Sequence, residues 1–363
     1  MYIGLLKEPD DRRVALVPRS CKQLLQLDGV QLLGEHDAGL LANFPATAYP
    51  EAVEWCDRQA VLERADLLVA IHPPAEAYTP ALAGKTVVAL FAPFRDDSVS
   101  TKLNEVGVNA LSLDMIPRTT LAQSMDILSS MASIAGYRAV LLAAQTLPRY
   151  FPMLITAAGS IKPARVLVLG AGVAGLQAIA TAKRLGAAVE AFDVRAAARE
   201  EVLSLGAKFI EVEGAAEDDG AGGYAVAQSE DYLARQRAAV QQSAAKADVV
   251  ITTAQVRGGK APILVSAETV AMMKPGSVIV DLAASTGGNC ALTENNKTIV
   301  SNGVTIIGDS DLAASMPEDA STLFGNNLVN FLKLIIQDGA LNFDMDQEII
   351  RSALITNQPN VPA

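Results

Sequence analysis

The chain has 363 residues, of which 50% are hydrophobic and 19% are charged, and this composition excludes a globally disordered protein. At about 150 residues per domain, the length predicts two domains. There are 29 Lys and Arg residues against 40 Asp and Glu, and the net charge of −11 argues against nucleic acid or an anionic membrane surface as the main partner.

Short apolar runs alternate with helical patterns in the N-terminal third. The first residues carry charges too early for a signal peptide. Buried strands are predicted at 67–71, 86–91 and 108–113, because each run is short and hydrophobic and most contain β-branched residues. Helical patterns lie at 20–27 and 98–106. This alternation favours an α/β fold with a mostly parallel sheet.

A long segment at 120–147 has small residues at near-helical spacing. Because small side chains let another backbone approach closely, we expect a tightly packed helix that links two domains. The most apolar long stretch, 139–159, is interrupted by an arginine and two prolines. No run reaches the roughly 20 apolar residues of a membrane helix, so we expect no membrane-spanning segment.

The middle and final parts of the chain continue the alternation. We predict strands at 165–169, 188–194, 208–212, 248–253, 277–282 and 304–308. Predicted helices lie at 173–185, 196–205, 266–273 and 321–337, and a helical pattern also leads up to residue 246. Residues 213–223 hold four acids, four glycines and no large apolar side chain, so we expect a mobile loop over 213–230.

A glycine-rich turn follows the strand predicted at 165–169. Gly170, Gly172 and Gly175 have G-x-G-x-x-G spacing between a Val/Leu strand and an amphipathic helix. In a dinucleotide-binding turn, the first glycine permits the tight turn, the second lets the backbone approach the pyrophosphate, and the third lets helix and strand pack closely. The phosphates would lie at the helix N-terminus, where free N–H groups favour anions.

An acidic residue stands where such a site needs one. Asp193 ends the next strand, about 20 residues beyond the turn, where an acid accepts hydrogen bonds from the adenosine ribose. Its charge would repel a 2′-phosphate, so NAD is favoured over NADP, although Arg195 is a residue type that accommodates that phosphate. The alternative is a structural glycine turn followed by a solvated acid.

A polar cluster follows the strand predicted at 108–113. Its members are Arg118, Gln123, Asp126 and Ser129. If the segment is helical, the three-residue spacing of the last three places them roughly on one face. An arginine, an amide, a carboxylate and a hydroxyl together suit a carboxamide ring such as nicotinamide. The alternative is a helix N-cap region with solvated polar side chains.

Several of these segments resemble the NAD(H)-binding component of proton-translocating nicotinamide nucleotide transhydrogenase, a relative of alanine dehydrogenase. The resemblance is carried by RTTLAQSMDILSSMASIAGYRAV, VLVLGAGVAGLQAIATAKRLGAAVEAFDVRAAAREEVLSLGAKF, GGNCALTE, ASTLFGNNLVNFL and KEPDDRRVALVP. It implies two Rossmann-like domains, with parallel sheets flanked by helices and an NAD cleft between them. The first domain would take residues 1–127 and 318–363, and the second, 128–317, would bind NAD(H).

The resemblance also implies roles for individual residues. The loop residues that would hold and orient the nicotinamide are Arg118, Gln123, Asp126 and Ser129. The pyrophosphate turn would take Gly170, Gly172, Val173 and Gly175, and the adenosine ribose would lie at Asp193, Val194 and Arg195. Tyr224 matches the tyrosine of a mobile loop that closes over the nucleotide. Further nucleotide-side positions are Gly223, Gln236 and Gln255, the last standing where an apolar residue near the adenine is expected.

The same resemblance implies partners and a location. In the family this component is a homodimer, and hydride passes between its NADH and NADP(H) bound on a separate subunit. A membrane-spanning subunit couples the transfer to proton translocation, so we expect a cytoplasmic protein held at the inner membrane through its complex. No metal site is expected, because the three cysteines are widely spaced and the chain has two histidines.

Acid–base chemistry separates the transhydrogenase from its relative. Alanine dehydrogenases hold the substrate carboxylate with an arginine, matched here by Arg13, and they use a lysine and a catalytic histidine. His72 stands at the lysine position, where we expect a structural residue, and LFAPFRDD has no histidine, so amino-acid oxidation lacks its proton acceptor. Hydride transfer between two nicotinamide rings needs alignment instead. A soluble amino-acid dehydrogenase and a non-catalytic NAD(H) sensor are the alternatives.

Overall fold

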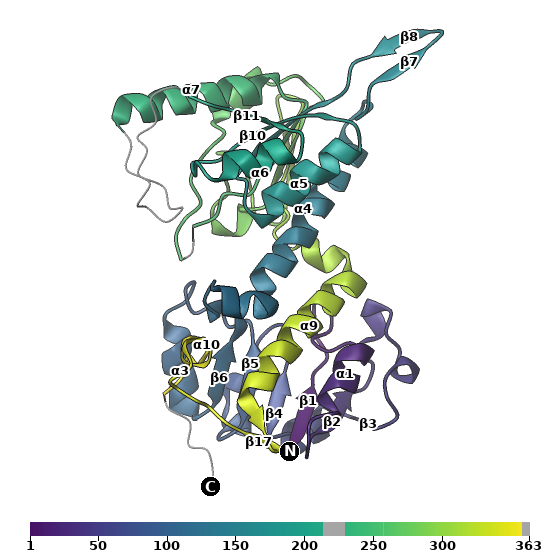
Figure 1. The fold of residues 1–363 in the computed structure, drawn as a ribbon, viewed down its shortest axis with the longest axis vertical. Helices are drawn as coiled ribbons and strands as arrows, with labels where there is room; N and C mark the ends of the chain where they lie inside the picture. The colour runs from purple at the N-terminus through teal and green to yellow at the C-terminus, as the bar shows by residue number, and fades with distance from the viewer. Residues whose placement is uncertain (213–228, 257, 358–363) are drawn as a thin grey trace. The chain divides into compact units, whose positions relative to one another are not determined.

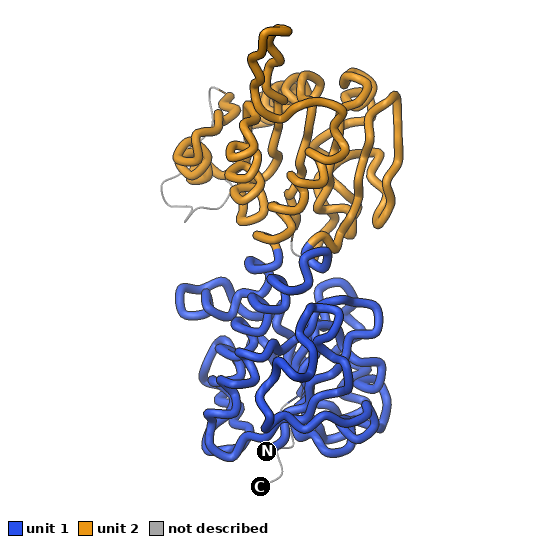
Figure 2. Tube along the Cα trace, turned by 90° about the vertical axis from the view of Figure 1, so that its right-hand side faces the viewer, with its two compact units in different colours: residues 1–131, 313–363 blue, residues 132–312 orange. Residues whose placement is uncertain are grey.

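The computed structural model describes residues 1–212, 229–256 and 258–357. The chain divides into two compact units, which Figure 2 shows in different colours. Unit 1 comprises residues 1–131 and 313–363, and unit 2 comprises residues 132–312. The unit limits at 131 and 312 lie close to the predicted limits at 127 and 317.

Unit 1 is built on a six-stranded parallel sheet with the order β3-β2-β1-β4-β5-β6 (Figure 1). Its strands are β1 (Tyr2–Leu5), β2 (Gln31–Glu35), β3 (Val53–Cys56), β4 (Leu67–Val69), β5 (Thr86–Ala89) and β6 (Asn109–Ser112). The three predicted strands are confirmed, but each ends before its apolar run does. Ile71, Phe91 and Leu113 lie beyond the strand ends and are still buried, so the apolar run marks burial rather than strand length.

Helices cover both faces of this sheet. Alternate strand residues point to opposite faces, which gives the unit two hydrophobic cores. One core is shared with α1 (Pro18–Leu24) and α9 (Pro317–Ile335), and the other with α2 (Arg58–Arg64) and α3 (Ser98–Val106). The C-terminal part of the chain thereby returns to unit 1, where α10 (Glu348–Ala353) follows α9. Helix α9 begins earlier than predicted because a proline suits the first helical turn.

Unit 2 is built on a seven-stranded sheet with the order β11-β10-β9-β12-β13-β15-β14, in which only the β14–β15 pair is antiparallel. Its strands are β9 (Arg165–Leu169), β10 (Ala188–Phe192), β11 (Lys208–Phe209), β12 (Val249–Thr252), β13 (Val278–Asp281), β14 (Thr298–Ser301) and β15 (Val304–Ile307). Strand β14 is absent from the prediction. The sequence does contain a signal for a hairpin, the dipeptide Asn302-Gly303. In the structure these two residues have φ values of 50° and 76° and form the turn between β14 and β15.

The helices of unit 2 follow the predicted order. They are α4 (Ile127–Thr146), which begins in unit 1, α5 (Val173–Arg184), α6 (Ala198–Ser204), α7 (Glu230–Lys246) and α8 (Ala267–Met272). A hairpin of β7 (Leu154–Thr156) and β8 (Gly159–Ile161) projects from the unit in Figure 1. This hairpin escapes prediction because its two short strands are mostly exposed and carry no alternation of buried and exposed side chains.

Among the described residues, α4 is the one helix long and apolar enough to cross a membrane, by length and composition. The expectation that no segment reaches this length is therefore wrong, since the apolar helix begins at Ile127 and ends before the prolines. Close packing explains its small residues. A Cβ on Gly136 would lie 2.1 Å from the carbonyl oxygen of Ala174 on α5, so glycine lets the two helices meet as predicted.

Candidate functional site

The predicted glycine turn lies at the carboxyl end of the unit 2 sheet. Strand β9 ends at Leu169 and α5 begins at Val173. The strand order reverses here, because β10 lies on one side of β9 and β12 on the other. Ligands of open α/β sheets bind outside the carboxyl ends of the strands at such a switch point.

The three glycines of the turn have different surroundings. Gly170 has a φ of +98°, which side chains rarely adopt. A Cβ on Gly175 would lie 1.8 Å from the Gly170 carbonyl oxygen, so a side chain here would force strand and helix apart. A Cβ on Gly172, the N-cap of α5, would meet no heavy atom of the described residues within 4 Å. This open space adjoins the free N–H groups of the helix and suits a pyrophosphate.

Alanine substitutions at Gly172 and Gly175 should have opposite effects. Gly172→Ala should weaken NADH binding about tenfold, because its methyl group would occupy the space beside the helix N-terminus. Its melting temperature should stay close to that of the parent chain. Gly175→Ala should lower the melting temperature by about 3 °C or more, because the overlap must displace backbone. NADH titration and thermal denaturation test the pair, and a matching loss of melting temperature in both variants would contradict the assignment.

Asp193 follows β10 and is largely buried. Its Oδ2 accepts a hydrogen bond from the Ala171 N–H at 2.7 Å, and the Arg195 guanidinium donates from Nε to Oδ1 at 3.0 Å and from Nη2 to Oδ2 at 3.1 Å. Burial raises the pKa of Asp193, but the bonds from Arg195 and Ala171 outweigh it and hold the pKa below its ordinary value. A charged carboxylate is therefore fixed beside the glycine turn. The side chain of Val194, which lies between Asp193 and Arg195 in the sequence, is exposed.

Polar side chains after β12 and β13 join the same end of the sheet. Thr253 Oγ1 donates to the Gly170 carbonyl oxygen at 3.0 Å. Asn289 Oδ1 accepts from the Ala254 N–H at 3.0 Å, and its Nδ2 donates to the Ala254 carbonyl oxygen at 2.8 Å. Gln255 is exposed and donates to a backbone carbonyl at 2.8 Å. Neither Thr253 nor Asn289 is predicted as a site residue. The position of a hydroxyl residue directly after a strand could have indicated Thr253. Asn289 belongs to a different loop, and no local pattern places it beside Ala254.

The remaining predicted nucleotide-side residues are placed only partly. Gly223 and Tyr224 lie outside the described residues, as does the predicted loop up to residue 228. The end of that loop needs correction, because Ser229 is the N-cap of α7 and accepts a hydrogen bond from the Tyr232 N–H at 3.2 Å. Gln236 lies half-buried on α7.

The predicted nicotinamide-side cluster lies in unit 1. It is not one continuous helix, because Thr120–Met125 form a 3₁₀ segment and α4 begins at Ile127. The single face expected for a helical segment is therefore not formed. Asp126 stands at the break, where its Oδ1 accepts from the Ser129 N–H at 2.9 Å and its Oδ2 from the Ser129 hydroxyl at 2.6 Å. For these two residues, the helix-cap interpretation describes the geometry.

Arg118 and Gln123 differ from this capped pair. Both side chains are exposed, and neither makes a hydrogen bond or ion pair with another residue that the structure describes. The loop therefore presents two exposed donor groups next to a fixed carboxylate and hydroxyl. The structure brings Asp126 and Ser129 together and leaves Arg118 and Gln123 accessible from solvent.

Arg13, which matches the substrate arginine of alanine dehydrogenases, is buried against Asp11. Its Nε lies 3.1 Å and 3.0 Å from the two carboxylate oxygens of Asp11. The Nε2 atom of His72 lies 3.0 Å from Asp11 Oδ2. Glu8, also buried, accepts the Ile71 N–H at 2.6 Å. The arginine is thus paired with a carboxylate of its own chain, and His72 makes a contact that ties the end of β4 to the N-terminal segment.

The contact between Asp11 and His72 changes the pKa of both groups. The hydrogen bond to Asp11 raises the pKa of His72 above its ordinary value, against the opposing effect of burial. Burial raises the pKa of Asp11, but the bonds from His72 and Arg13 outweigh it and hold that pKa well below its usual range. Because the folded state binds the His72 proton more tightly than the unfolded state, the contact stabilises the fold below the unfolded pKa. This stabilisation is lost as the pH rises through the folded pKa.

Replacing His72 by Gln should therefore destabilise the chain more at pH 5.5 than at pH 9. We expect a loss of at most about 1 kcal/mol at the lower pH, because half of the His72 side chain is exposed and solvent screens the pair. Urea denaturation at both pH values measures the difference. His36→Gln, at the other and exposed histidine, is the matched control, and an equal loss for His72→Gln at both pH values would contradict the prediction.

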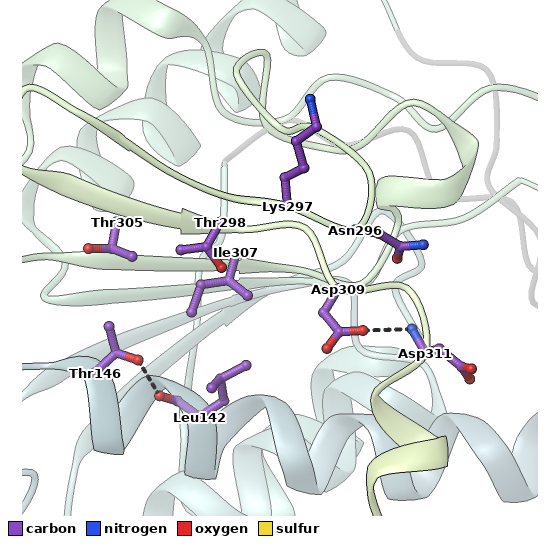
Figure 3. Close-up of a pocket in the computed structure, with 9 residues that line it drawn as sticks. All are labelled: Leu142, Thr146, Asn296, Lys297, Thr298, Thr305, Ile307, Asp309 and Asp311. Carbon is purple, nitrogen blue, oxygen red and sulfur yellow. Dashed lines mark hydrogen bonds between the residues drawn. The ribbon is translucent and has the colours of Figure 1, made fainter. Parts of the chain in front are cut away.

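A pocket of about 520 Å³ lies between α4, β14 and β15 (Figure 3). None of the predicted site residues lines it. Asp309 accepts the Asp311 N–H at 2.9 Å, and the Thr146 hydroxyl donates to the Leu142 carbonyl oxygen at 2.8 Å, so these polar groups bond within their own segments. The pocket is separate from the residues assigned to the nucleotide.

Comparison with known proteins shows relatives along the whole chain. The family models for the alanine dehydrogenase/PNT N-terminal and C-terminal domains match residues 4–135 and 139–362. An alpha-subunit chain of NAD(P) transhydrogenase from Rhodospirillum rubrum is 44% identical over 344 residues, covering 92% of this chain and 89% of that protein. The NAD(P) transhydrogenase subunit alpha of Haemophilus influenzae is 40% identical over 361 residues, covering 98% of this chain and 70% of that protein.

A solved structure agrees with these sequence matches. The crystal structure of transhydrogenase from Sinorhizobium meliloti matches with a TM-score of 0.88 at 40% identity, and the match covers 98% of both chains. The predicted resemblance and the α/β fold with parallel sheets flanked by helices are confirmed. NAD(H) binding follows at the level of the family. The chain therefore belongs to the alanine dehydrogenase/PNT family and, within it, groups with the alpha subunits of NAD(P) transhydrogenase.

Proposed function

We propose that this chain binds NAD(H) and exchanges hydride with NADP(H) held on a partner subunit. The observation that supports this most is the turn at the switch point of the unit 2 sheet. Open space at Gly172 adjoins the N-terminus of α5, and the charged Asp193 carboxylate lies beside it. This is the residue set that a dinucleotide needs.

The residues of the glycine turn and of the polar loop fit NAD(H). The N–H groups at the start of α5 would bind the pyrophosphate, and Asp193 would accept hydrogen bonds from the adenosine ribose. The loop residues Arg118, Gln123, Asp126 and Ser129 would orient the carboxamide ring. The nicotinamide, when bound, supplies the hydride. The task of the protein is then to hold that ring in one orientation, since alignment dominates the rate of such a transfer.

The surroundings of Arg13 and His72 favour hydride exchange over amino-acid oxidation. Oxidation of an amino acid needs a group to take up a proton, and the chain has two histidines in all. His72 is hydrogen-bonded to Asp11, and the guanidinium that would hold a substrate carboxylate is bonded to the same aspartate. Transfer between two nicotinamide rings requires neither group.

Membership of the alanine dehydrogenase/PNT family also indicates which subunits this chain would assemble with. We infer a homodimer that meets an NADP-binding subunit, with a membrane-spanning subunit that couples hydride transfer to proton translocation. The chain would then work at the cytoplasmic face of the inner membrane, held peripherally through that complex. The relatives named as subunits of a transhydrogenase support this assembly.

Hydride transfer measured directly tests the proposal. The purified chain would be mixed with a transhydrogenase NADP-binding component carrying an NADP+ analogue, and NADH would be added. Fast reduction of the analogue that depends on this chain is the expected result. Tight NADH binding without transfer would favour an NAD(H) sensor, and NAD reduction that depends on alanine would favour an amino-acid dehydrogenase.

A further inference from the structure

A buried asparagine on α9 joins the two sides of the Asp126 turn. We propose that Asn327 is a positioning residue for hydride transfer, which it serves by fixing the loop that carries Asp126 and Ser129. This inference rests on the proposed function, because it assigns Asn327 to the same loop.

The side chain of Asn327 uses both of its polar atoms on this loop. Its Nδ2 donates to the Ser124 carbonyl oxygen at 2.8 Å, and its Oδ1 accepts from the Ser130 hydroxyl at 2.7 Å. Ser124 belongs to the 3₁₀ segment and Ser130 to the first turn of α4, so the two contacts lie on either side of Asp126. One side chain thereby ties the two helical segments together across Asp126.

The other bonds across this turn hold it less firmly. The Asp126 N–H reaches the Gln123 carbonyl oxygen at 3.3 Å, and the Ser130 N–H reaches the Asp126 carbonyl oxygen at 3.2 Å. The Asp126 carboxylate is bonded to Ser129 within the same turn, so this pair moves with the turn and does not anchor it. Ala122, Met125 and Ile127 of the segment are buried in the core of unit 1, and Asn327 adds hydrogen bonds from outside the segment to both sides of the turn.

The helix that carries Asn327 is a rigid support. Asn327 is 8% exposed, and Phe324, Leu328 and Phe331 around it are wholly buried in the core of unit 1. Asn330, one turn on, donates to the same Ser124 carbonyl oxygen at 3.0 Å but, among the described residues, makes no hydrogen bond with Ser130. Asn327 is therefore the residue of this pair that bridges both sides. The position of the loop would fix the orientation of a nicotinamide ring held by it. Small displacements of a reacting ring lower the rate of transfer by large factors.

The decisive variant is Asn327→Leu, which keeps a side chain of similar size in the buried site and removes both hydrogen bonds. We expect hydride transfer to fall about tenfold, because a displacement of about 1 Å costs on the order of a hundredfold in rate and the loss of two hydrogen bonds should shift the loop by less than that. NADH affinity should stay within about twofold, since the glycine turn and Asp193 are untouched. Single-turnover transfer and NADH titration, both on the full chain with its NADP-binding partner, measure the two quantities.

Leu332→Ala is the matched control. It removes buried volume from the same helix and leaves the hydrogen bonds of the loop in place, so it should lower the melting temperature and leave transfer unchanged. If Asn327→Leu and Leu332→Ala have the same ratio of transfer loss to stability loss, Asn327 is merely structural and the inference is overturned. Should Asn327→Leu fail to fold, Asn327→Asp serves instead, because it keeps the acceptor for Ser130 and loses the donor to Ser124.

A double-mutant cycle with Ser130→Ala tests the route of the effect. The losses in transfer should be less than additive, because both variants remove the same hydrogen bond. Fully additive losses would overturn the proposed route through Ser130. If the parent chain itself binds NADH and transfers no hydride, the proposed function fails and this inference fails with it. If the parent transfers and Asn327→Leu transfers equally well, only this inference fails.

Discussion

Asp126→Asn should lower hydride transfer about a hundredfold while NADH affinity changes by less than about threefold. The carboxylate lies at the break between the 3₁₀ segment and α4, where it binds both the N–H and the hydroxyl of Ser129. Asparagine has the same shape and can accept one of these bonds, so the turn should survive. What is lost is the negative charge and the direction of the Ser129 hydroxyl, and under the proposed function both would act on the bound ring rather than on the adenosine half. The rate of hydride transfer should therefore fall far more than the affinity for NADH.

Asp57→Asn is the matched control for this experiment. Asp57 is also an N-cap aspartate of unit 1, and its side chain accepts the Ala60 N–H at 2.8 Å at the start of α2. Because asparagine caps a helix about as well as aspartate, this variant should keep both the stability of α2 and the rate of hydride transfer. Equal losses of rate and NADH affinity in Asp126→Asn, or equal rates in the two variants, would rule out a ring-orienting role.

The features that are predictable from sequence here are local ones. The glycine turn needs a strand, three glycines and a helix within a few residues, and all of these are visible as neighbours in the chain. The order of the glycines even indicates their separate surroundings, from the positive φ of Gly170 to the close contact of Gly175. Asp193 is equally visible, because the end of the next parallel strand must lie beside the end of the first.

The features that escape prediction depend on contacts between distant segments. Asn327 reaches Ser124 and Ser130 from the far end of the sequence, and no periodicity in the helix distinguishes it from its neighbour Asn330. Asn289 approaches Ala254 in the same way. The bend at Asp126 is a different case, since three-residue spacing is compatible with both a 3₁₀ segment and an α-helix, and only tertiary packing decides between them.

Asp193→Ser should shift the nucleotide preference of the chain toward NADPH by about a hundredfold or more. In the parent, the Arg195 guanidinium donates to the Asp193 carboxylate and, at 3.2 Å, to the Ala171 carbonyl oxygen. These hydrogen bonds within the protein occupy donors that a 2′-phosphate would need. Serine removes the carboxylate that would repel a 2′-phosphate. It also releases a guanidinium that is 41% exposed and able to bind that phosphate. Each change is worth about 1.5–3 kcal/mol, or roughly 10- to 100-fold.

The double variant Asp193→Ser with Arg195→Ala separates these two contributions. If Arg195 is the new phosphate ligand, the double variant should lose most of the gain in NADPH affinity and bind NADH about as weakly as the single variant. Titration of both nucleotides with all three proteins gives the ratios directly, and low salt makes the phosphate contribution largest because screening is weakest there. A single variant that loses NADH affinity without gaining NADPH affinity would show that Arg195 is not released. In that case the Ala171 carbonyl, rather than Asp193, would be what holds the guanidinium in place.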